Sequence, residues 1–450
     1  MGPGLSAMLV FIAIMIIWAL VVKRDMAEAT LIGMLIVAAF GGSNALAILK
    51  DGLKYALNYE VLFASLAFVL MSFLLQNTSV LKGMLRIFNR LFKRLKGGPA
   101  YVNTAISSFL GMLSGGNTAN AATSGAFTAQ WLMDSGWTKE QAATLIAGNG
   151  GLGAGFPPSS SMFIVLGFPT VMYAVTQGQL YIALMLTGFY QVAWRTVYIH
   201  WVIKKNGIGY PQNVSTEPWR VILKESGKNL LLFLGPIIPV AFTMGPIADA
   251  IAARSDLWAD AVDSINMLVW IPTIMIVVVL CLGWKDIKAK YQTAESLVDD
   301  IIPQFKSTSG LLFFVFAASR MINKLGLSTD MEVILQQLNF PPVVAVFVIL
   351  ILIAIVAGPL SSSATLTSVG LISHSILVAA GMDPLCAATA ILMVASTEGA
   401  SPPASGALFV ACGLTECDPP KIYVPLIVWF VVPIVAIAAL VCFGILPIPH

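Results

Sequence analysis

The chain has 450 residues, of which 58% are hydrophobic and only 10% are charged, and its net charge is +3. A soluble globular domain carries roughly 25% charged residues, so this composition excludes an ordinary soluble protein and indicates a polytopic helical membrane protein. The small net charge argues against nucleic-acid binding. The five cysteines include no CxxC pair, so neither a disulfide framework nor a zinc site is expected.

The N-terminal part contains three apolar runs that are long enough to cross a membrane. We expect spans over about 5–22, 29–49 and 59–77. The basic residues of segment 82–96 follow the third span, and the positive-inside rule places this segment in the cytoplasm. Its spacing also suits an amphipathic helix that lies along the membrane surface.

The next region is a pair of short apolar arms, over about 99–113 and 119–133, joined by the polar residues SGGNT. Each arm is short for a full crossing, which predicts a re-entrant hairpin that enters from the cytoplasm. A broken span follows over about 139–175, and the sequence GNGGLGAGFPP interrupts it.

The middle of the chain contains four further apolar runs, and the charges between them alternate in sign. These spans are expected over about 180–203, 229–248, 265–283 and 308–322. Counting from the cytoplasmic basic segment, the chain then lies on the outer face. A second hairpin, with arms over about 341–357 and 364–380, therefore enters from the opposite side.

A second broken span is expected over about 384–415, with its interruption at TEGASPP, and a last span over about 422–445. The total is about eleven spans and two opposed hairpins. The two hairpin-plus-break blocks match without gaps at a constant offset of 245 residues, as in Pro157 and Pro402. Paired Gly/Pro-broken segments in two inverted halves point to a substrate and ion site near the membrane midplane.

The residues at the hairpin tips and breaks favour binding through the backbone and small hydroxyls. Non-helical backbone at membrane depth must be buried in protein or line a wet cavity, and Pro157 and Pro402 each remove an amide donor. Unwound carbonyls and hydroxyls can coordinate a hard cation such as Na⁺, and half-helix N-termini can face an anion. The carbonyls freed by the breaks belong to Gly153, Ala154, Gly155, Thr397, Gly399 and Ala400.

Four ionisable residues in apolar segments have more than one interpretation. Glu398, inside the second break, is a cation ligand, a proton site or half of a buried salt bridge. Arg195 could pair with a substrate carboxylate, but its place near the cytoplasmic end favours a snorkelling anchor. Arg320 is expected to be a boundary anchor, and His374 a hydrogen-bonded packing residue rather than a proton relay.

The chain contains no P-loop, no HExxH and no GxGxxG that opens a βαβ unit. We therefore do not expect an enzyme, and an ion gradient is the expected source of energy.

Segment 114–161, which reads SGGNTANAATSGAFTAQWLMDSGWTKEQAATLIAGNGGLGAGFPPSSS, resembles the large membrane subunit of TRAP transporters, the DctM type. Segment 381–414, GMDPLCAATAILMVASTEGASPPASGALFVACGL, resembles that family's second broken span. The resemblance implies an elevator-type, Na⁺-coupled importer of organic anions in a bacterial or archaeal cytoplasmic membrane. It also implies two partners: a small four-span membrane subunit and a periplasmic substrate-binding protein.

The resemblance assigns site residues by motif position. One Na⁺ site would use Ser114, Asn117, Gly151, Gly153 and Pro157. The other would use Gly358, Ser361, Ser362, Thr397, Glu398 and Ala400. The organic anion would lie near Asn117, Thr118, Ser159, Ser362 and Ser363.

Two alternatives stay open. One is a stand-alone Na⁺- or H⁺-coupled carboxylate permease of the same broad architecture, which would need no binding protein. The other is a cation/proton antiporter or a membrane scaffold that transports nothing. Antiport would make Glu398 and His374 dominate the pH dependence of activity, whereas a scaffold would tolerate the loss of Asn117 and Ser362.

Overall fold

The structure is a computed structural model that describes residues 2–449, except 93–94, 115, 211–216, 244–245, 328, 331–340, 359 and 403–404. Every regular element in these described residues is a helix, which confirms the all-α fold class. Four of their helices have the length and apolar composition to cross a membrane, and two sharply bent helix pairs raise that number to six. The chain is thus a multi-pass membrane protein, while the figure of about eleven spans stays a prediction.

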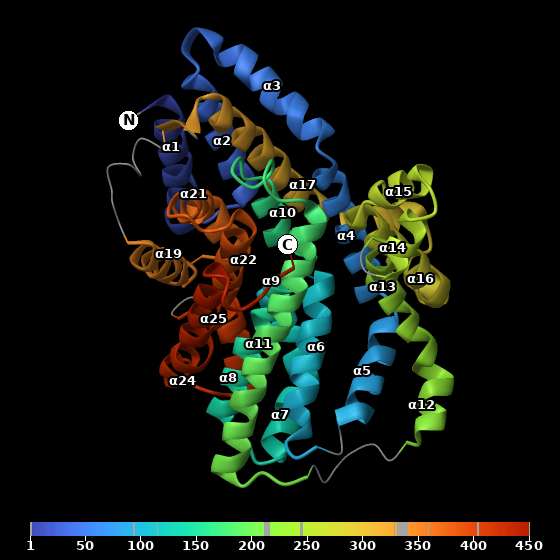
Figure 1. Cartoon of the computed structure of the whole chain (residues 1–450). Helices are drawn as coiled ribbons and strands as arrows, with labels where there is room; N and C mark the ends of the chain where they lie inside the picture. The colour runs from blue at the N-terminus through green and yellow to red at the C-terminus, as the bar shows by residue number, and fades with distance from the viewer. Residues whose placement is uncertain are drawn as a thin grey trace. The chain divides into compact units, whose positions relative to one another are not determined.

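The chain divides into two compact units (Figure 1). The larger unit comprises residues 1–62, 92–212 and 307–450, and the smaller unit comprises residues 63–91 and 213–306. The helices α4 (Glu60–Gln76) and α17 (Ala294–Lys324) each contain a boundary between the units. Both hairpins and both broken spans belong to the larger unit.

The smaller unit contains the basic amphipathic helix. This helix, α5 (Val80–Phe92), buries an apolar face that includes Met84 and Leu85 and confirms the predicted amphipathic segment. Arg86 forms ion pairs of 2.7 Å with Glu217 and 2.6 Å with Glu225. The other elements of this unit are α12 (Trp219–Ser226), η3 (Gly227–Phe233), α13 (Leu234–Thr243), α14 (Pro246–Ala252), α15 (Asp256–Asp263) and α16 (Met267–Lys290).

The predicted second span, 29–49, is wrong as a single helix. The chain forms α2 (Met26–Ala39), a short turn, and α3 (Ala45–Asn58). Gly42 adopts a positive φ of 55°, a left-handed conformation that ends helices and that glycine adopts without strain. The polar residues that follow it then lie on a separate helix, which is bent by 47° against α4.

The two hairpins have the predicted helices. In the first, α6 (Gly98–Ser114) precedes α7 (Asn117–Asp134). In the second, α19 (Pro342–Val356) precedes a continuous helix over Ser362–Ala379 that consists of α20, η4 and α21. The second arms of the two hairpins are therefore both 18 residues long and start at equivalent positions of the duplication.

The broken spans show the same correspondence. Helices α8 (Lys139–Gly150) and α22 (Pro384–Ala395) each have 12 residues, and each begins at a side-chain cap, Thr138 or Asp383. Such caps accept hydrogen bonds from amide groups that a helix start leaves unpaired. Short helical turns lie in the breaks themselves. In the first break α9 (Leu152–Gly155) leads to α10 (Ser160–Leu166), and in the second η5 (Ser396–Ala400) leads to α23 (Gly406–Thr415).

The two halves of the duplication interlock rather than lying apart. Helix α23 of the second half packs against α7 and α8 of the first, and α10 of the first half packs against α20 and η4 of the second. Helix α11 (Gln177–Asn206) lies beside α6 (Figure 1) and also contacts α9 and α22. The last span, α24 (Pro420–Leu426), η6 (Ile427–Val431) and α25 (Val432–Cys442), packs through α25 on α22 and α19. The described part of the larger unit also includes α1 (Pro3–Ile17), η1 (Trp18–Val22), α2, η2 (Gly42–Asn44) and α3.

Candidate functional site

The first residues of the two hairpin helices meet. Asn117 begins α7, Ser362 begins the helix over 362–379, and these two residues occupy equivalent positions of the duplication. The amide nitrogen Nδ2 of Asn117 lies 3.0 Å from Oγ of Ser362. The two hairpin tips are thus joined by the same position of each repeat.

The Asn117 side chain connects both breaks as well as both tips. Its Nδ2 donates to Oε2 of Glu398 at 2.6 Å and lies 3.2 Å from the carbonyl oxygen of Ser396. Its Oδ1 accepts a hydrogen bond of 2.9 Å from the amide of Ala154. A carboxamide NH₂ has two hydrogens, and here it faces three acceptors, so this nitrogen is fully used.

Glu398 is a buried carboxylate without a cationic partner. Only 7% of its surface is exposed, and its Oε2 also lies 3.2 Å from Oγ of Ser362. No ion pair of Glu398 with a basic side chain occurs among the residues that the structure describes. An ionised group at membrane depth is costly unless positive charge compensates it. The salt-bridge interpretation of Glu398 therefore has no support among the described residues. The other two interpretations, a cation ligand and a proton site, stay open.

The two breaks cross at glycines. A Cβ atom on Gly151 would lie 2.6 Å from the carbonyl oxygen of Ser396, and one on Gly399 would lie 2.8 Å from the amide nitrogen of Gly151. Real Cβ atoms do not approach other atoms this closely, so only glycine permits the contact. This crossing places the C-terminal ends of α8 and α22 beside each other, where the carbonyls of helix ends are negative.

The structure places the expected Na⁺ ligands around these tips and breaks. Gly151, Gly153 and Pro157 are buried in the first break, and Thr397 and Ala400 are buried in the second. A Cβ on Gly153 would lie 2.8 Å from the carbonyl oxygen of Gly116, next to Asn117. A Cβ on Gly358 would lie 2.7 Å from the carbonyl oxygen of Pro402. Ser361 caps the helix over 362–379. The side chain of Ser114 lies outside the described part of the structure, and ion binding by these residues stays a prediction.

Three of the five expected substrate residues form none of the hydrogen bonds described above for Asn117 and Glu398. Thr118 is exposed and adjoins Gly406 of α23. Ser159 is buried, caps α10 through Met162 and donates to the carbonyl of Ala154. Ser363 is partly exposed, one residue beyond the tip. Their role in substrate binding stays a prediction.

Arg195 is not a snorkelling anchor, and that interpretation is wrong. The side chain is only 2% exposed, because it lies between α11, the end of α8 and the Phe430 ring of η6. Its Nη2 donates to the carbonyl oxygen of Gly148 at 2.9 Å, its Nη1 donates to that of Gln191 at 3.1 Å, and it lies over the Phe430 ring. A charge in an otherwise apolar span was the one signal for this buried position, whereas the place of Arg195 near the end of the span pointed to an anchor.

The two other ionisable residues have clear partners. His374 forms hydrogen bonds through both ring nitrogens. Its Nε2 donates to the carbonyl of Pro384 at 3.0 Å, and its Nδ1 lies 2.7 Å from the hydroxyl of Thr170. Because Nε2 carries the hydrogen, Nδ1 accepts from the hydroxyl, which confirms a hydrogen-bonded packing histidine. Arg320 forms a 3.1 Å ion pair with Asp51 and donates to Tyr173 at 2.5 Å.

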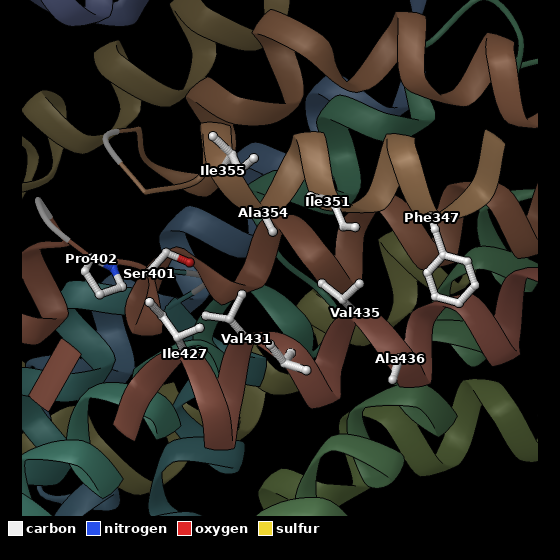
Figure 2. A pocket seen from close by; sticks show the side chains of 11 residues that line it. Phe347, Ile351, Ala354, Ile355, Ser401, Pro402, Ile427, Val431, Val435 and Ala436 are labelled. Atoms are coloured by element: carbon white, nitrogen blue, oxygen red, sulfur yellow. The ribbon is translucent and has the colours of Figure 1, made fainter. Parts of the chain in front are cut away.

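An apolar groove of about 600 Å³ lies beside the second break (Figure 2). Its walls come from α19 and from the last span, and Ser401 and Pro402 close one end. The Ser401 hydroxyl already donates to the carbonyl of Thr397 at 2.9 Å. Such a lining offers no charge or free donor to an anion, so the polar tips are the better candidate for a solute site.

Comparisons with known proteins identify a family and two similar folds. The family model described as the tripartite ATP-independent periplasmic transporter, DctM component, matches residues 7–446. Among solved structures, the chain resembles the Alcanivorax borkumensis YdaH transporter, with a TM-score of 0.60 and 13% identity over 91% of this chain and 90% of that one. It also resembles Neisseria gonorrhoeae MtrF, an antimetabolite efflux pump, with a TM-score of 0.52 and 15% identity over 89% and 85%. No curated protein matches the sequence.

The glycine crossing predicts a steric effect that a matched glycine does not share. Gly151→Ala should lower the unfolding free energy by about 1–3 kcal/mol, because the new methyl group meets the Ser396 carbonyl. Gly413→Ala is the control, since Gly413 is exposed on α23 and a Cβ there meets nothing within 4 Å. Thermal unfolding in detergent measures both. Equal melting temperatures for the two variants would contradict the close crossing.

Proposed function

The chain belongs to the DctM component family of tripartite ATP-independent periplasmic transporters, and we propose that it is the permease subunit of a Na⁺-coupled importer of an organic carboxylate. The observation that carries the proposal is Glu398, which is buried at the contact of the two hairpin tips and forms no ion pair with a basic side chain among the described residues. The proposed movement is an elevator, in which the interlocked hairpins and broken spans carry the solute across together.

The tips offer an anion the positive ends of two helices. The N-terminus of α7 and that of the helix over 362–379 converge where Asn117 and Ser362 meet. Helix N-termini favour negative groups through their unpaired amides and their dipole. We propose that the substrate carboxylate binds here, with Asn117, Thr118, Ser362 and Ser363 as its contacts and Ser159 nearby.

Glu398 then provides the reason for coupling. Its negative charge lies within hydrogen-bond distance of Asn117 and Ser362, so it repels an organic anion at the tips. Like charges close together in a medium of low dielectric constant interact strongly. The solute is therefore retained only when positive charge enters with it, which links solute binding to cation binding.

Neutral oxygens around the carboxylate suit Na⁺ as that positive charge. Hard cations prefer oxygen ligands, and unwound carbonyls in paired breaks are a common source of them. The proposed ligands are Ser114, Asn117, Gly151, Gly153 and Pro157 in the first half, and Gly358, Ser361, Ser362, Thr397, Glu398 and Ala400 in the second. A bound cation would supply the charge that compensates Glu398.

The family implies partners and a place in the cell. We propose a small four-span membrane subunit, a periplasmic substrate-binding protein that delivers the solute, and a bacterial or archaeal cytoplasmic membrane. The alternative function is a stand-alone carboxylate permease driven by Na⁺ or H⁺. Glu398 favours the H⁺-driven form of this alternative, because a buried carboxylate that forms no ion pair among the described residues can be neutralised by a proton as well as by a cation.

Uptake into proteoliposomes tests the function. With the small subunit present, we expect concentrative carboxylate uptake only when both a Na⁺ gradient and the binding protein are supplied. Uptake by this chain alone would favour the stand-alone permease. Uptake that ignores Na⁺ and follows a pH gradient would overturn Na⁺ coupling and make Glu398 a proton carrier.

The tip contact itself can be tested by truncation. Asn117→Ala and Ser362→Ala should each reduce the initial uptake rate by about 10–100-fold, because each removes a hydrogen bond to a charged group. Ser375→Ala is the matched control, since that buried hydroxyl donates only within its own helix, to the carbonyl of Leu371. Near-normal uptake in both tip variants, with normal folding, would reject the assignment.

Neutralising Glu398 should separate binding from coupling. In Glu398→Gln the amide keeps the shape of the side chain but removes its charge, so solute should bind at low Na⁺ while concentrative uptake is lost. The control is Glu416→Gln, because Glu416 is an exposed glutamate at the end of α23. Solute binding measured against Na⁺ concentration decides the matter, and a variant with unchanged Na⁺ dependence would refute this role.

A further inference from the structure

A second buried polar cluster lies inside the first hairpin, apart from the tips. It forms where α6, α7 and α8 pack against one another. Its members are at most 4% exposed and project from one face of each helix: Asn103, Thr104 and Ser107, then Asn120, Ser124 and Thr128, and finally Asn149. Neither the Na⁺ ligands nor the substrate contacts proposed above include any of them.

Hydrogen-bond directions in this cluster follow from main-chain acceptors. The Thr128 hydroxyl donates to the Ser124 carbonyl at 2.7 Å, so its oxygen accepts from Nδ2 of Asn103 at 2.8 Å. Oδ1 of Asn103 must then accept, and Nδ2 of Asn149 donates to it at 2.7 Å. The orientation of the Asn149 amide is thereby set, and its Oδ1 has no hydrogen-bond partner among the described residues.

Asn120 is oriented by the same kind of argument. Its Nδ2 donates to the carbonyls of Ser107 at 2.9 Å and Gly150 at 3.3 Å. Because carbonyls only accept, the atom that faces them is the nitrogen, and the orientation of the amide oxygen Oδ1 is fixed. Three buried oxygens of this cluster have no hydrogen-bond partner: Oγ of Ser107, Oδ1 of Asn120 and Oδ1 of Asn149. Buried polar atoms are rarely unpaired, because an unpaired one has lost its hydrogen bonds to water without replacement.

The fold does not require this polarity. Val394 of α22 occupies the position equivalent to Asn149 of α8, and both side chains are fully buried near the end of a 12-residue helix. A buried valine at this position is compatible with the same hairpin-and-break architecture. The amide in the first half therefore needs a reason other than packing.

We propose that these three oxygens bind a monovalent cation of the Na⁺ type, at a site separate from the tips. Amide oxygens only accept hydrogen bonds, and hard cations prefer such ligands. The site lies at the C-terminal end of α8, where the helix dipole is negative. Asn120 also lies one turn from Asn117, which binds the buried carboxylate of Glu398.

These two sources of negative potential favour a cation over a water molecule. Arg195, a basic side chain near this helix end, donates to the Gly148 carbonyl, whereas the Gly150 carbonyl accepts from Asn120. The proposal does not depend on Na⁺-coupled transport, because binding alone is sufficient to test it.

The test counts radioactive Na⁺ bound to the purified full chain, with choline as the replacement ion. Asn149→Val, which introduces the residue of the second half, should lower the number of bound ions by one. Ser107→Ala removes only one ligand atom and should raise the half-saturating Na⁺ concentration by about tenfold. Ser368→Ala is the control, because it removes a buried, unpartnered hydroxyl of the second half, and it should change neither quantity.

An unchanged count in Asn149→Val together with unchanged affinity in Ser107→Ala would overturn the proposal and leave an ordered water only. Size-exclusion profiles verify folding, and if Asn149→Val does not fold, the affinity of Ser107→Ala decides alone. Na⁺-independent uptake in proteoliposomes would defeat the proposed coupling without altering this count, so the two failures are distinguishable.

Discussion

The carboxamide of Asn117 is the interaction on which the central arrangement depends. It bonds to Glu398 and Ser396 of the second break, to Ser362 of the second tip and to the amide of Ala154 in the first break. Unwound backbone at membrane depth has no water to satisfy it, so one side chain with two donors and an acceptor serves several open positions. This one group therefore connects both tips and both breaks of the duplication.

Charge is the second constraint. The larger unit buries a carboxylate, Glu398, and a guanidinium, Arg195, and neither forms an ion pair within the described residues. Arg195 donates to the Gly148 carbonyl near the end of α8, where the helix dipole already favours a cation. Glu398 has only neutral donors. This imbalance is what a transporter can use, because the missing positive charge can be supplied from outside and released again.

Duplication explains the architecture, and the differences between the copies indicate where function resides. Helices α8 and α22 have equal length and begin at caps in equivalent positions, so the fold is repeated in detail. The chemistry is not repeated: Asn149 of the first copy corresponds to Val394 of the second, and Gly153 corresponds to Glu398. The first copy contributes buried amides, whereas the second contributes the carboxylate.

Local signals in the sequence determined most of the helices. Gly, Pro and small polar clusters interrupt helices, so both hairpins, both broken spans and the amphipathic helix α5 were predictable. The turn at Gly42 and the short helices α12, α14 and α15 were not predicted. Tertiary structure decided what the sequence could not: that Asn117 meets Ser362 across the duplication and that Arg195 faces inward. The physical reason is the separation in sequence of the residues that interact. A break depends on a few neighbouring residues, whereas a contact between residues far apart in sequence depends on how several helices rotate and pack.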